Sequence, residues 1–111
     1  MKKEINSYIE DIRFSILRIE LHIKDIESFK IFKTSYTVYD AVERRLAIIG
    51  EAMWQINKIE PKINFTGKEK IIGLRHILTH DYDLVSPEII WKILENNIPI
   101  LKQEIDEQQK K

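Results

Sequence analysis

The chain has 111 residues, of which 43% are apolar and 32% are charged, and it contains no cysteine. A chain of this length buries one hydrophobic core, so we expect a single domain over residues 1–111. The lack of cysteine excludes a disulfide framework, a zinc–thiolate site and a cysteine nucleophile. Any chemistry must therefore come from histidine, carboxylate, tyrosine, lysine or arginine side chains.

No apolar run approaches the ~18 residues that span a membrane, and no export signal is visible, so we expect a cytoplasmic protein without a membrane partner. The 18 basic and 18 acidic side chains balance, which argues against non-specific coating of nucleic acid such as DNA. Residues 28–80, however, hold nine basic and five acidic side chains, a net charge of +4. Six of these basic residues form either a surface for a polyanion or an ordinary solvated helix face: Arg44, Arg45, Lys62, Lys68, Lys70 and Arg75.

The sequence predicts an all-helical fold, because glycine and proline are rare and no hairpin dipeptide such as Asn-Gly is present. A first helix is expected at about residues 3–27, where isoleucines recur at alternating steps of four and three: Ile5, Ile9, Ile12, Ile16, Ile19, Ile23 and Ile26. A second apolar stripe on this helix, formed by Phe14, Leu17 and Leu21, favours a helix bundle over a two-stranded rod.

After a connector, a second helix is expected at residues 35–59, and Pro61 should end it. Its inward face is predicted to carry Val38, Val42, Ile49, Met53 and Ile56. Gly50 lies in the middle of this helix, where glycine costs about 1 kcal/mol relative to alanine. Together with Ala47, it predicts a place where another helix approaches closely.

Two further helices complete an up-and-down bundle of four. Thr66 and Glu69 have the spacing of a capping box that starts the third helix. Ser86 and Pro87 predict the N-cap and first turn of the fourth. Pro99 should kink or split this last helix, and residues 108–111 are expected to be frayed.

Polar residues with chemical potential concentrate at the end of the third helix. His76 and His80 are four residues apart and should share a helix face, which is also the spacing of a metal-binding pair. No third ligand is placed to complete such a site, so no metal is expected. The alternative is that one histidine caps the carbonyl groups at the helix end and the other lies on the surface.

Arg75 and His80 are five residues apart, so they diverge by roughly 140° around a straight helix. They can serve one ligand if the helix ends near His80 and the ring turns back, or if two copies meet in a symmetric dimer. Tyr82, seven residues after Arg75, would return to the face of the arginine. The alternative is that Arg75 pairs with a carboxylate of the bundle and Tyr82 is an ordinary half-buried tyrosine.

The run Arg75-x4-His80-x-Tyr82 resembles the motif of the HEPN superfamily, in which the position of His76 commonly carries Asn, Asp or His. Residues 40–52, 71–75 and 91–101 are similar, in order and spacing, to the HepT-like toxin branch, so the resemblance covers about residues 38–105. The chain departs from the frequent pattern at His76, where Asn is common, and at Asp81, where Gly is common.

The resemblance implies a homodimeric HEPN-type bundle that acts as a metal-independent ribonuclease, with Arg75 and His80 as catalytic residues and His76 as polar support. RNA supplies its own nucleophile, the 2′-hydroxyl group, so a histidine for proton transfer and an arginine for the phosphoryl oxygens suffice. Candidate RNA contacts are Arg44, Arg45, Lys68 and Lys70.

For Tyr82, the resemblance implies modification by a cognate minimal nucleotidyltransferase antitoxin, which attaches AMP units from ATP-Mg in a type VII toxin–antitoxin system. The chain itself would then need no cofactor. Two alternatives stay open. One is a non-catalytic helical dimer that binds a nucleotidyltransferase and a nucleotide, and the other is a structural bundle in which Arg75, His80 and Tyr82 only satisfy one another.

Overall fold

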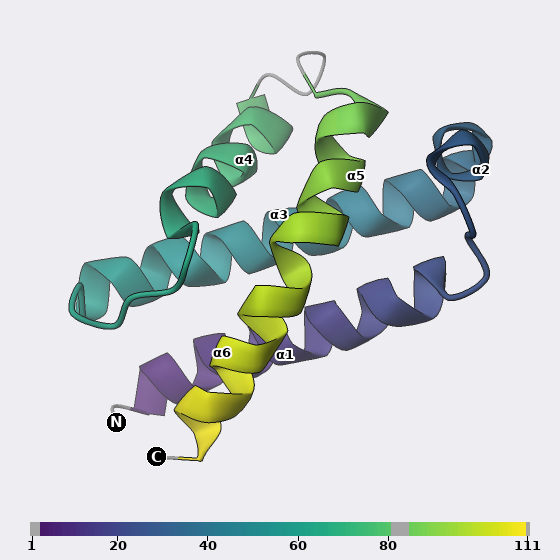
Figure 1. The fold of residues 1–111 in the computed structure, drawn as a ribbon. Coiled ribbons are helices and arrows are strands. Elements are labelled where there is room, and N and C mark those ends of the chain that lie inside the picture. Colours follow the sequence, from purple (N-terminus) through teal and green to yellow (C-terminus); the bar gives the residue numbers. More distant parts are fainter. Residues whose placement is uncertain (1–2, 81–84, 111) are drawn as a thin grey trace.

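The computed structural model of the chain describes residues 3–80 and 85–110. Within these ranges the chain forms helices joined by short loops, without a β-strand, which confirms the all-helical prediction (Figure 1). The helices are α1 (Lys3–Ile23), α2 (Phe29–Thr34), α3 (Tyr36–Ile59), α4 (Lys68–His80), α5 (Pro87–Asn96) and α6 (Ile98–Gln109). None of the described helices is both long enough and apolar enough to cross a membrane.

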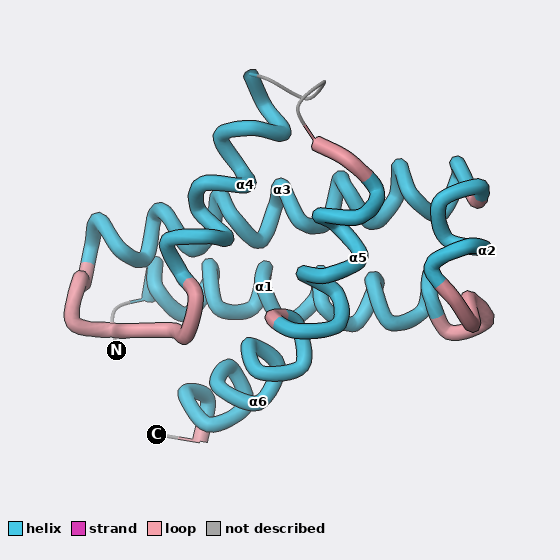
Figure 2. Tube along the Cα trace, turned by 45° about the horizontal axis from the view of Figure 1, so that its top comes forward, coloured by secondary structure: helices cyan, strands magenta, loops and turns pink. Residues whose placement is uncertain are grey.

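The two longest helices, α1 and α3, lie side by side and run in opposite directions (Figures 1 and 2). Helix α4 packs on α3, and α6 packs on α1. Helix α5 continues into α6. The short α2 lies where α1 ends and α3 begins, and it contacts both α5 and α3. The arrangement is the predicted up-and-down bundle, with a last helix made of two parts.

The hydrophobic core follows the predicted periodicity. Five isoleucines of α1 are 0–2% exposed: Ile5, Ile9, Ile12, Ile16 and Ile19. The predicted inward residues of α3 are also buried, apart from the half-buried Val38: Val42, Ile49, Met53 and Ile56. Each such side chain stabilises the fold by about 1.5–3 kcal/mol when it leaves water. The isoleucine seam therefore holds α1 against its neighbours, although the helix ends at Ile23 rather than near residue 27.

The second apolar stripe of α1 is not part of this core. Phe14, Leu17 and Leu21 are 42%, 40% and 62% exposed, because the isoleucine seam faces the bundle and the stripe lies on another side of the helix. The guanidinium carbons of Arg18 and Arg45 lie 4.8 and 5.3 Å from the centroid of the Phe14 ring. The bundle that this stripe favoured is confirmed, but within the protomer the stripe itself stays largely exposed.

The predicted connector contains the short helix α2, which the sequence patterns did not indicate. The Ser28 hydroxyl oxygen caps it by accepting a hydrogen bond from the backbone N–H of Ile31 at 3.3 Å. Phe32 is fully buried, with its ring centroid 5.0 Å from that of Trp91 and 5.7 Å from that of Tyr39. Burial of this one ring anchors α2 to α5 and α3.

The start and the division of the last helix agree with the sequence. The Ser86 hydroxyl oxygen accepts a hydrogen bond from the N–H of Ile89 at 3.4 Å, and Pro87 occupies the first turn of α5. Helix α5 ends at Asn96 and α6 begins at Ile98, so the chain is split just before Pro99, as expected. Helix α6 runs to Gln109 and so includes two of the residues where fraying was expected.

The predicted capping box at the start of α4 is wrong. The backbone N–H and the hydroxyl group of Thr66 both donate hydrogen bonds to the carboxylate of Glu104 in α6, at 2.9 and 2.8 Å. Gly67 follows with a φ of +75°, and α4 begins only at Lys68. Because this positive φ separates Thr66 from the first turn, Thr66 ties α4 to α6 instead of pairing with Glu69.

Candidate active-site cleft

Gly50 allows α4 to lie directly on α3. A Cβ atom added at Gly50 would stand 2.9 Å from the carbonyl oxygen of Ile71 and 3.3 Å from the Cα atom of Arg75, and it would be closer still to the Cβ atom of Arg75. Any larger residue would therefore push the helices apart. The predicted close approach is confirmed, and it places the base of the Arg75 side chain against the surface of α3.

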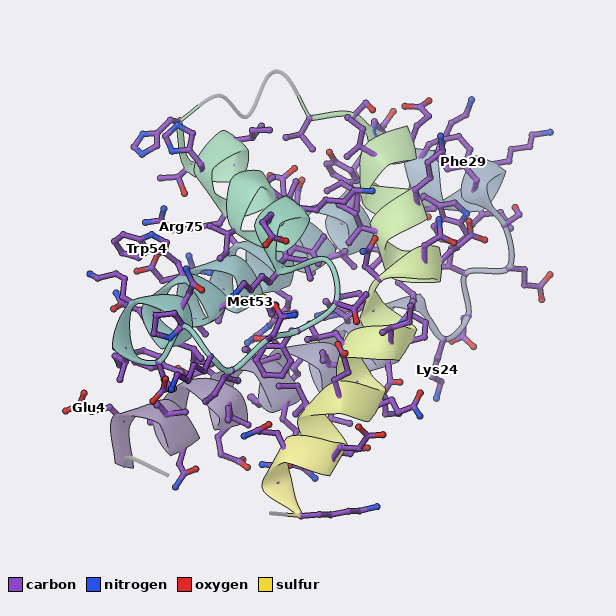
Figure 3. The ribbon with its side chains drawn as sticks, turned by 60° about the vertical axis from the view of Figure 1, so that its left-hand side comes forward. Glu4, Lys24, Phe29, Met53, Trp54 and Arg75 are labelled. Atoms are coloured by element: carbon purple, nitrogen blue, oxygen red, sulfur yellow. The ribbon has the colours of Figure 1, made fainter. Side chains whose placement is uncertain are left out.

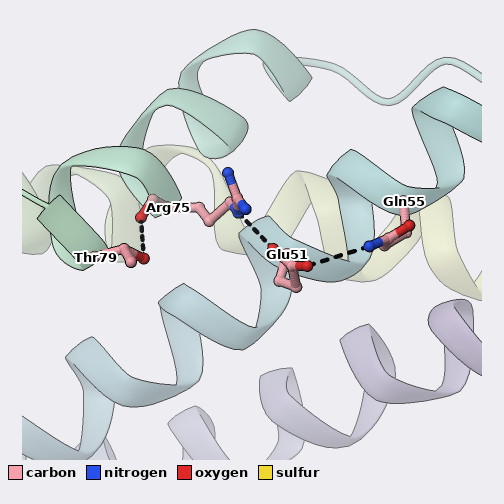
Figure 4. Close-up of polar contacts among 4 residues, drawn as sticks. All are labelled: Glu51, Gln55, Arg75 and Thr79. Carbon is pink, nitrogen blue, oxygen red and sulfur yellow. Dashed lines mark hydrogen bonds and ion pairs between the residues drawn. The ribbon is translucent and has the colours of Figure 1, made fainter.

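The guanidinium group of Arg75 is held by two side chains of α3. Its Nε–H group donates a hydrogen bond to Oε2 of Glu51 at 2.5 Å, and its Cζ atom lies 4.6 Å from the centroid of the Trp54 ring. The other carboxylate oxygen of Glu51 accepts a hydrogen bond from Nε2 of Gln55 at 3.2 Å (Figure 4). Figure 3 shows Arg75 and Trp54 next to each other, one from each helix.

Opposing effects act on the pKa of the Glu51 carboxyl group. Burial raises this pKa, whereas the hydrogen bonds from Arg75 and Gln55 and the positive charge of Arg75 lower it. The hydrogen bonds and the charge prevail, so the pKa lies below the ordinary value of 4.5. Glu51 is therefore an anion at neutral pH and forms a charge-assisted pair with the guanidinium group.

The pair forms part of the wall of an open cleft between α1, α3 and α4, with a volume of about 290 Å³. Its polar lining comes from six side chains: Tyr8, Asp11, Arg44, Glu51, Arg75 and Thr79. The Arg75 side chain is 23% exposed and the Glu51 side chain 47% exposed, so both reach solvent. The two arginines balance the carboxylates of Asp11 and Glu51 in charge, and they provide multiple hydrogen-bond donors for a phosphate group.

The two histidines of α4 lie outside the lining of this cleft. His76 and His80 are exposed on the last two turns of α4, and their ring centroids are 4.8 Å apart, so they share a face as predicted. In residues 3–80 and 85–110, no third His, Asp or Glu side chain joins them to form a cluster that could hold a metal ion. The structure thus brings Arg75 and Arg44 together but does not bring His80 to them within one protomer.

The residues predicted to contact RNA lie in different parts of the structure. Arg44 lines the cleft, whereas Arg45 packs over the Phe14 ring. The Lys68 ammonium group donates hydrogen bonds to Oδ1 of Asn57 at 2.8 Å and to the carbonyl oxygen of Pro61 at 3.5 Å. Lys70 is exposed in the first turn of α4. The predicted modification of Tyr82 and the departure from the family pattern at Asp81 concern residues 81–84, which lie outside the described part of the chain.

Sequence reasoning assigned no role to Glu51 or Trp54. The alternative in which Arg75 pairs with a carboxylate of the bundle is what the structure shows, and Glu51 is that carboxylate. One signal points to it: Glu51 directly follows Gly50, the residue predicted to touch another helix, and Trp54 is one turn further along the same face of α3.

Comparisons with known proteins place the chain. Residues 12–107 match the family model described as "Ribonuclease HepT-like". A protein of Thermococcus cleftensis named "Probable ribonuclease HepT" is 32% identical, and the match covers 99% of this chain and 100% of that protein. A protein of Methanocaldococcus jannaschii named "Putative RNase MJ1380" is 31% identical over 95% of this chain and 96% of its own length.

A longer protein of Methanocaldococcus jannaschii, named "Gamma-glutamylcyclotransferase and putative RNase MJ0434", is 35% identical over 95% of this chain, and the match covers 47% of that protein. Comparison with solved structures gives no match. The family model spans nearly the whole helical bundle, from α1 to α6, and it includes the cleft residues Arg44, Glu51 and Arg75. The chain therefore belongs to the HepT-like ribonuclease family.

Proposed function

We propose that the chain is the toxin of a toxin–antitoxin system, a metal-independent endoribonuclease whose active site is shared between the two protomers of a homodimer. The observation that carries this proposal is that Arg75 lines an open cleft that Arg44 also lines. Glu51 occupies its Nε–H group, and the hydrogen bonds among the described residues leave its two terminal nitrogens for a ligand.

The chemistry requires few groups. The 2′-hydroxyl group of RNA attacks the adjacent phosphorus atom, a base takes its proton, and an acid protonates the leaving 5′-oxygen. Histidine can perform either proton transfer near neutral pH, which is the role proposed for His80. Arg75 stabilises the negative charge on the phosphoryl oxygens of the transition state, and His76 supports His80 from the neighbouring turn of α4.

A second copy of the chain is needed to complete this site. Within one protomer Arg75 faces α3 and His80 does not line the same cleft, as their separation of roughly 140° around the helix dictates. A two-fold axis near the end of α4 would bring the His80 imidazole of one protomer to the cleft of the other. The proposal therefore requires a homodimer in which neither protomer alone holds a complete site.

Cleavage of purified total RNA in the presence of EDTA tests the activity. The wild type should cleave, and Arg75→Ala and His80→Ala should each abolish cleavage while the helical content is unchanged. His22→Ala, which removes the third histidine of the chain, serves as the matched control and should cleave like the wild type. Full activity of His80→Ala would refute the mechanism. A wild type that binds a nucleotidyltransferase but cleaves no RNA would support the alternative, a non-catalytic binding module.

A complementation experiment tests the shared site. Arg75→Ala and His80→Ala chains carrying different tags are expressed together, and the mixed dimers are isolated. If the arginine of one protomer works with the histidine of the other, a mixed dimer retains one intact Arg75–His80 pair and recovers part of the activity. If mixed dimers are as inactive as each variant alone, the site is not shared in this way.

For regulation, we propose that a cognate minimal nucleotidyltransferase uses ATP-Mg to attach AMP to Tyr82. Tyr82 follows His80 by two residues in the sequence, and each AMP unit adds about one negative charge and a bulky nucleoside that would oppose entry of RNA phosphate. Incubation with the partner and ATP-Mg should add mass increments of AMP to the wild type and to Tyr36→Phe, in which a tyrosine 73% exposed is removed. The same increments on Tyr82→Phe would show that another residue is modified.

A further inference from the structure

We propose that Glu51 is a positioning residue for Arg75: with Trp54, it fixes the guanidinium plane and leaves the two terminal nitrogens as the donors for a ligand. This inference rests on the proposed ribonuclease function, because it assigns the group that aims the phosphate-binding arginine. It adds to the motif two residues that lie on a different helix and more than 20 positions earlier in the chain.

The contacts around Arg75 define its orientation in two directions. The hydrogen bond from Nε to Glu51 fixes the edge of the guanidinium group, and the Trp54 ring, with its centroid 4.6 Å from Cζ, lies against its face. A planar group held at one edge and one face has little freedom to rotate. Nη1 and Nη2, which make no hydrogen bond to the described residues, are the donors that remain for a phosphate.

The carboxylate of Glu51 is itself held in place. Gln55 donates a hydrogen bond to the oxygen that Arg75 does not use, at 3.2 Å, and Glu51, Trp54 and Gln55 lie on one face of α3 at spacings of three and four residues. Because Gly50 has no side chain, α4 can approach α3 closely enough for Arg75 to contact this face. The support for Arg75 is therefore built from one rigid helix.

A purely structural ion pair is the competing explanation, and it predicts different behaviour. Pairs that are as exposed as Glu51 and Arg75 contribute little to folding stability. A negative charge beside a site for polyanions also weakens binding of RNA, so its presence in the cleft is unfavourable unless it improves the geometry of the reaction. Positioning thus predicts a loss of turnover without a loss of RNA binding.

Steady-state cleavage of a defined RNA by Glu51→Gln distinguishes these explanations. We expect kcat to fall about 10- to 100-fold, since small displacements of a catalytic group have effects of this size. KM should stay the same or fall, because a negative charge next to the RNA has been removed. Glu51→Asp, which keeps the charge on a shorter side chain, should recover part of the lost kcat. Wild-type kcat in Glu51→Gln would overturn the inference.

The matched control is Glu95→Gln, which makes the same change in charge at an exposed position on α5. It should leave kcat unchanged, and any effect of Glu95→Gln on KM measures the contribution of net charge alone. Trp54→Leu removes the aromatic face while keeping an apolar side chain, and it should lower kcat in the same direction as Glu51→Gln. Wild-type kcat in Trp54→Leu would show that the ring has no part in positioning.

A measurement without RNA separates this inference from the proposed function. The Arg75 Nε–H signal in ¹⁵N NMR spectra, assigned with Arg75→Lys, should be protected from exchange in the wild type and in Glu95→Gln, and unprotected in Glu51→Gln. A protected signal in a wild type that cleaves no RNA would refute only the proposed function. An unprotected signal in an active wild type would refute only the positioning role.

Discussion

Gly50 of α3 and Arg75 of α4 are in direct contact, with no room for a side chain on the glycine. This contact sets the distance between the two helices at the point where the candidate catalytic arginine begins. The pairing of Arg75 with Glu51, the next residue after Gly50, depends on the same approach of the helices. Packing and the geometry of the cleft are therefore determined by one small residue.

Gly50→Ala should destabilise the fold, although alanine is normally the better helix former by about 1 kcal/mol. The new methyl group would meet the backbone of Ile71 and Arg75 and force α4 away from α3, at a net loss of about 1–3 kcal/mol in the free energy of unfolding. Urea denaturation followed by circular dichroism measures this loss.

Gly73 provides the matched control for this substitution. It lies on α4, and a Cβ atom added there would have no neighbour within 4 Å. Gly73→Ala should therefore stabilise the protein by about 0.4–1 kcal/mol, mainly by restricting the unfolded chain. Equal effects of the two substitutions would show that the contact between Gly50 and Arg75 is not tight in solution.

The ion pair between Glu51 and Arg75 should make stability depend on pH in the acidic range. The pKa of Glu51 is lower in the folded protein than its ordinary value of 4.5. The ionised carboxylate therefore stabilises the fold above pH 4.5, and this contribution is lost as the pH falls below 4.5 through the folded-state pKa. The difference in unfolding free energy between the wild type and Glu51→Gln should shrink between pH 6 and pH 3. A difference that stays constant over this range would contradict the lowered pKa.

Glu104, and not Glu69, should stabilise the start of α4. Glu104→Ala removes the acceptors of both Thr66 hydrogen bonds. Each bond contributes at most about 0.5–1.5 kcal/mol to the free energy of unfolding, because both are exposed, and the variant should lose this contribution. Glu69→Ala should have a smaller effect, since only the favourable charge in the first turn of α4 is lost. Thermal unfolding of both variants shows which one loses more stability. A larger loss in Glu69→Ala would support the capping box between Thr66 and Glu69.

Tyr39 should ionise at unusually high pH. Burial, together with the negative charge and the hydrogen bond of Glu43, raises the pKa of its hydroxyl group from 10.0 to about 12. An absorbance titration of tyrosinate should show a component near pH 12 that is lost in Tyr39→Phe, kept in Tyr36→Phe and shifted down in Glu43→Gln. Since the folded-state pKa is the higher one, the stability contributed by the neutral hydroxyl is lost as the pH rises from 10 to 12.

Much of the fold could be predicted because the signals are local. The spacing of isoleucines in α1 and of apolar residues in α3 requires one buried face per helix, and these faces are buried. Ser86, Pro87 and Pro99 act on their own backbone, so their effects on α5 and α6 did not depend on the rest of the structure. The shared face of His76 and His80 could be predicted for the same reason, since a helix fixes the relative direction of residues a few positions apart.

The tertiary structure alone decided which partners these residues have. Glu51 and Arg75 are 24 residues apart and Thr66 and Glu104 are 38 apart, and no local pattern couples side chains over such distances. In the same way, the stripe of Phe14, Leu17 and Leu21 satisfies helical periodicity whether or not a neighbouring helix covers it, and in this protomer none does. The sequence by itself determined where the longer helices form and which face of each is apolar, because those properties depend on neighbours within one or two turns. The choice of contacts across helices required the packed bundle, because it depends on how closely backbones approach, as Gly50 and Arg75 show.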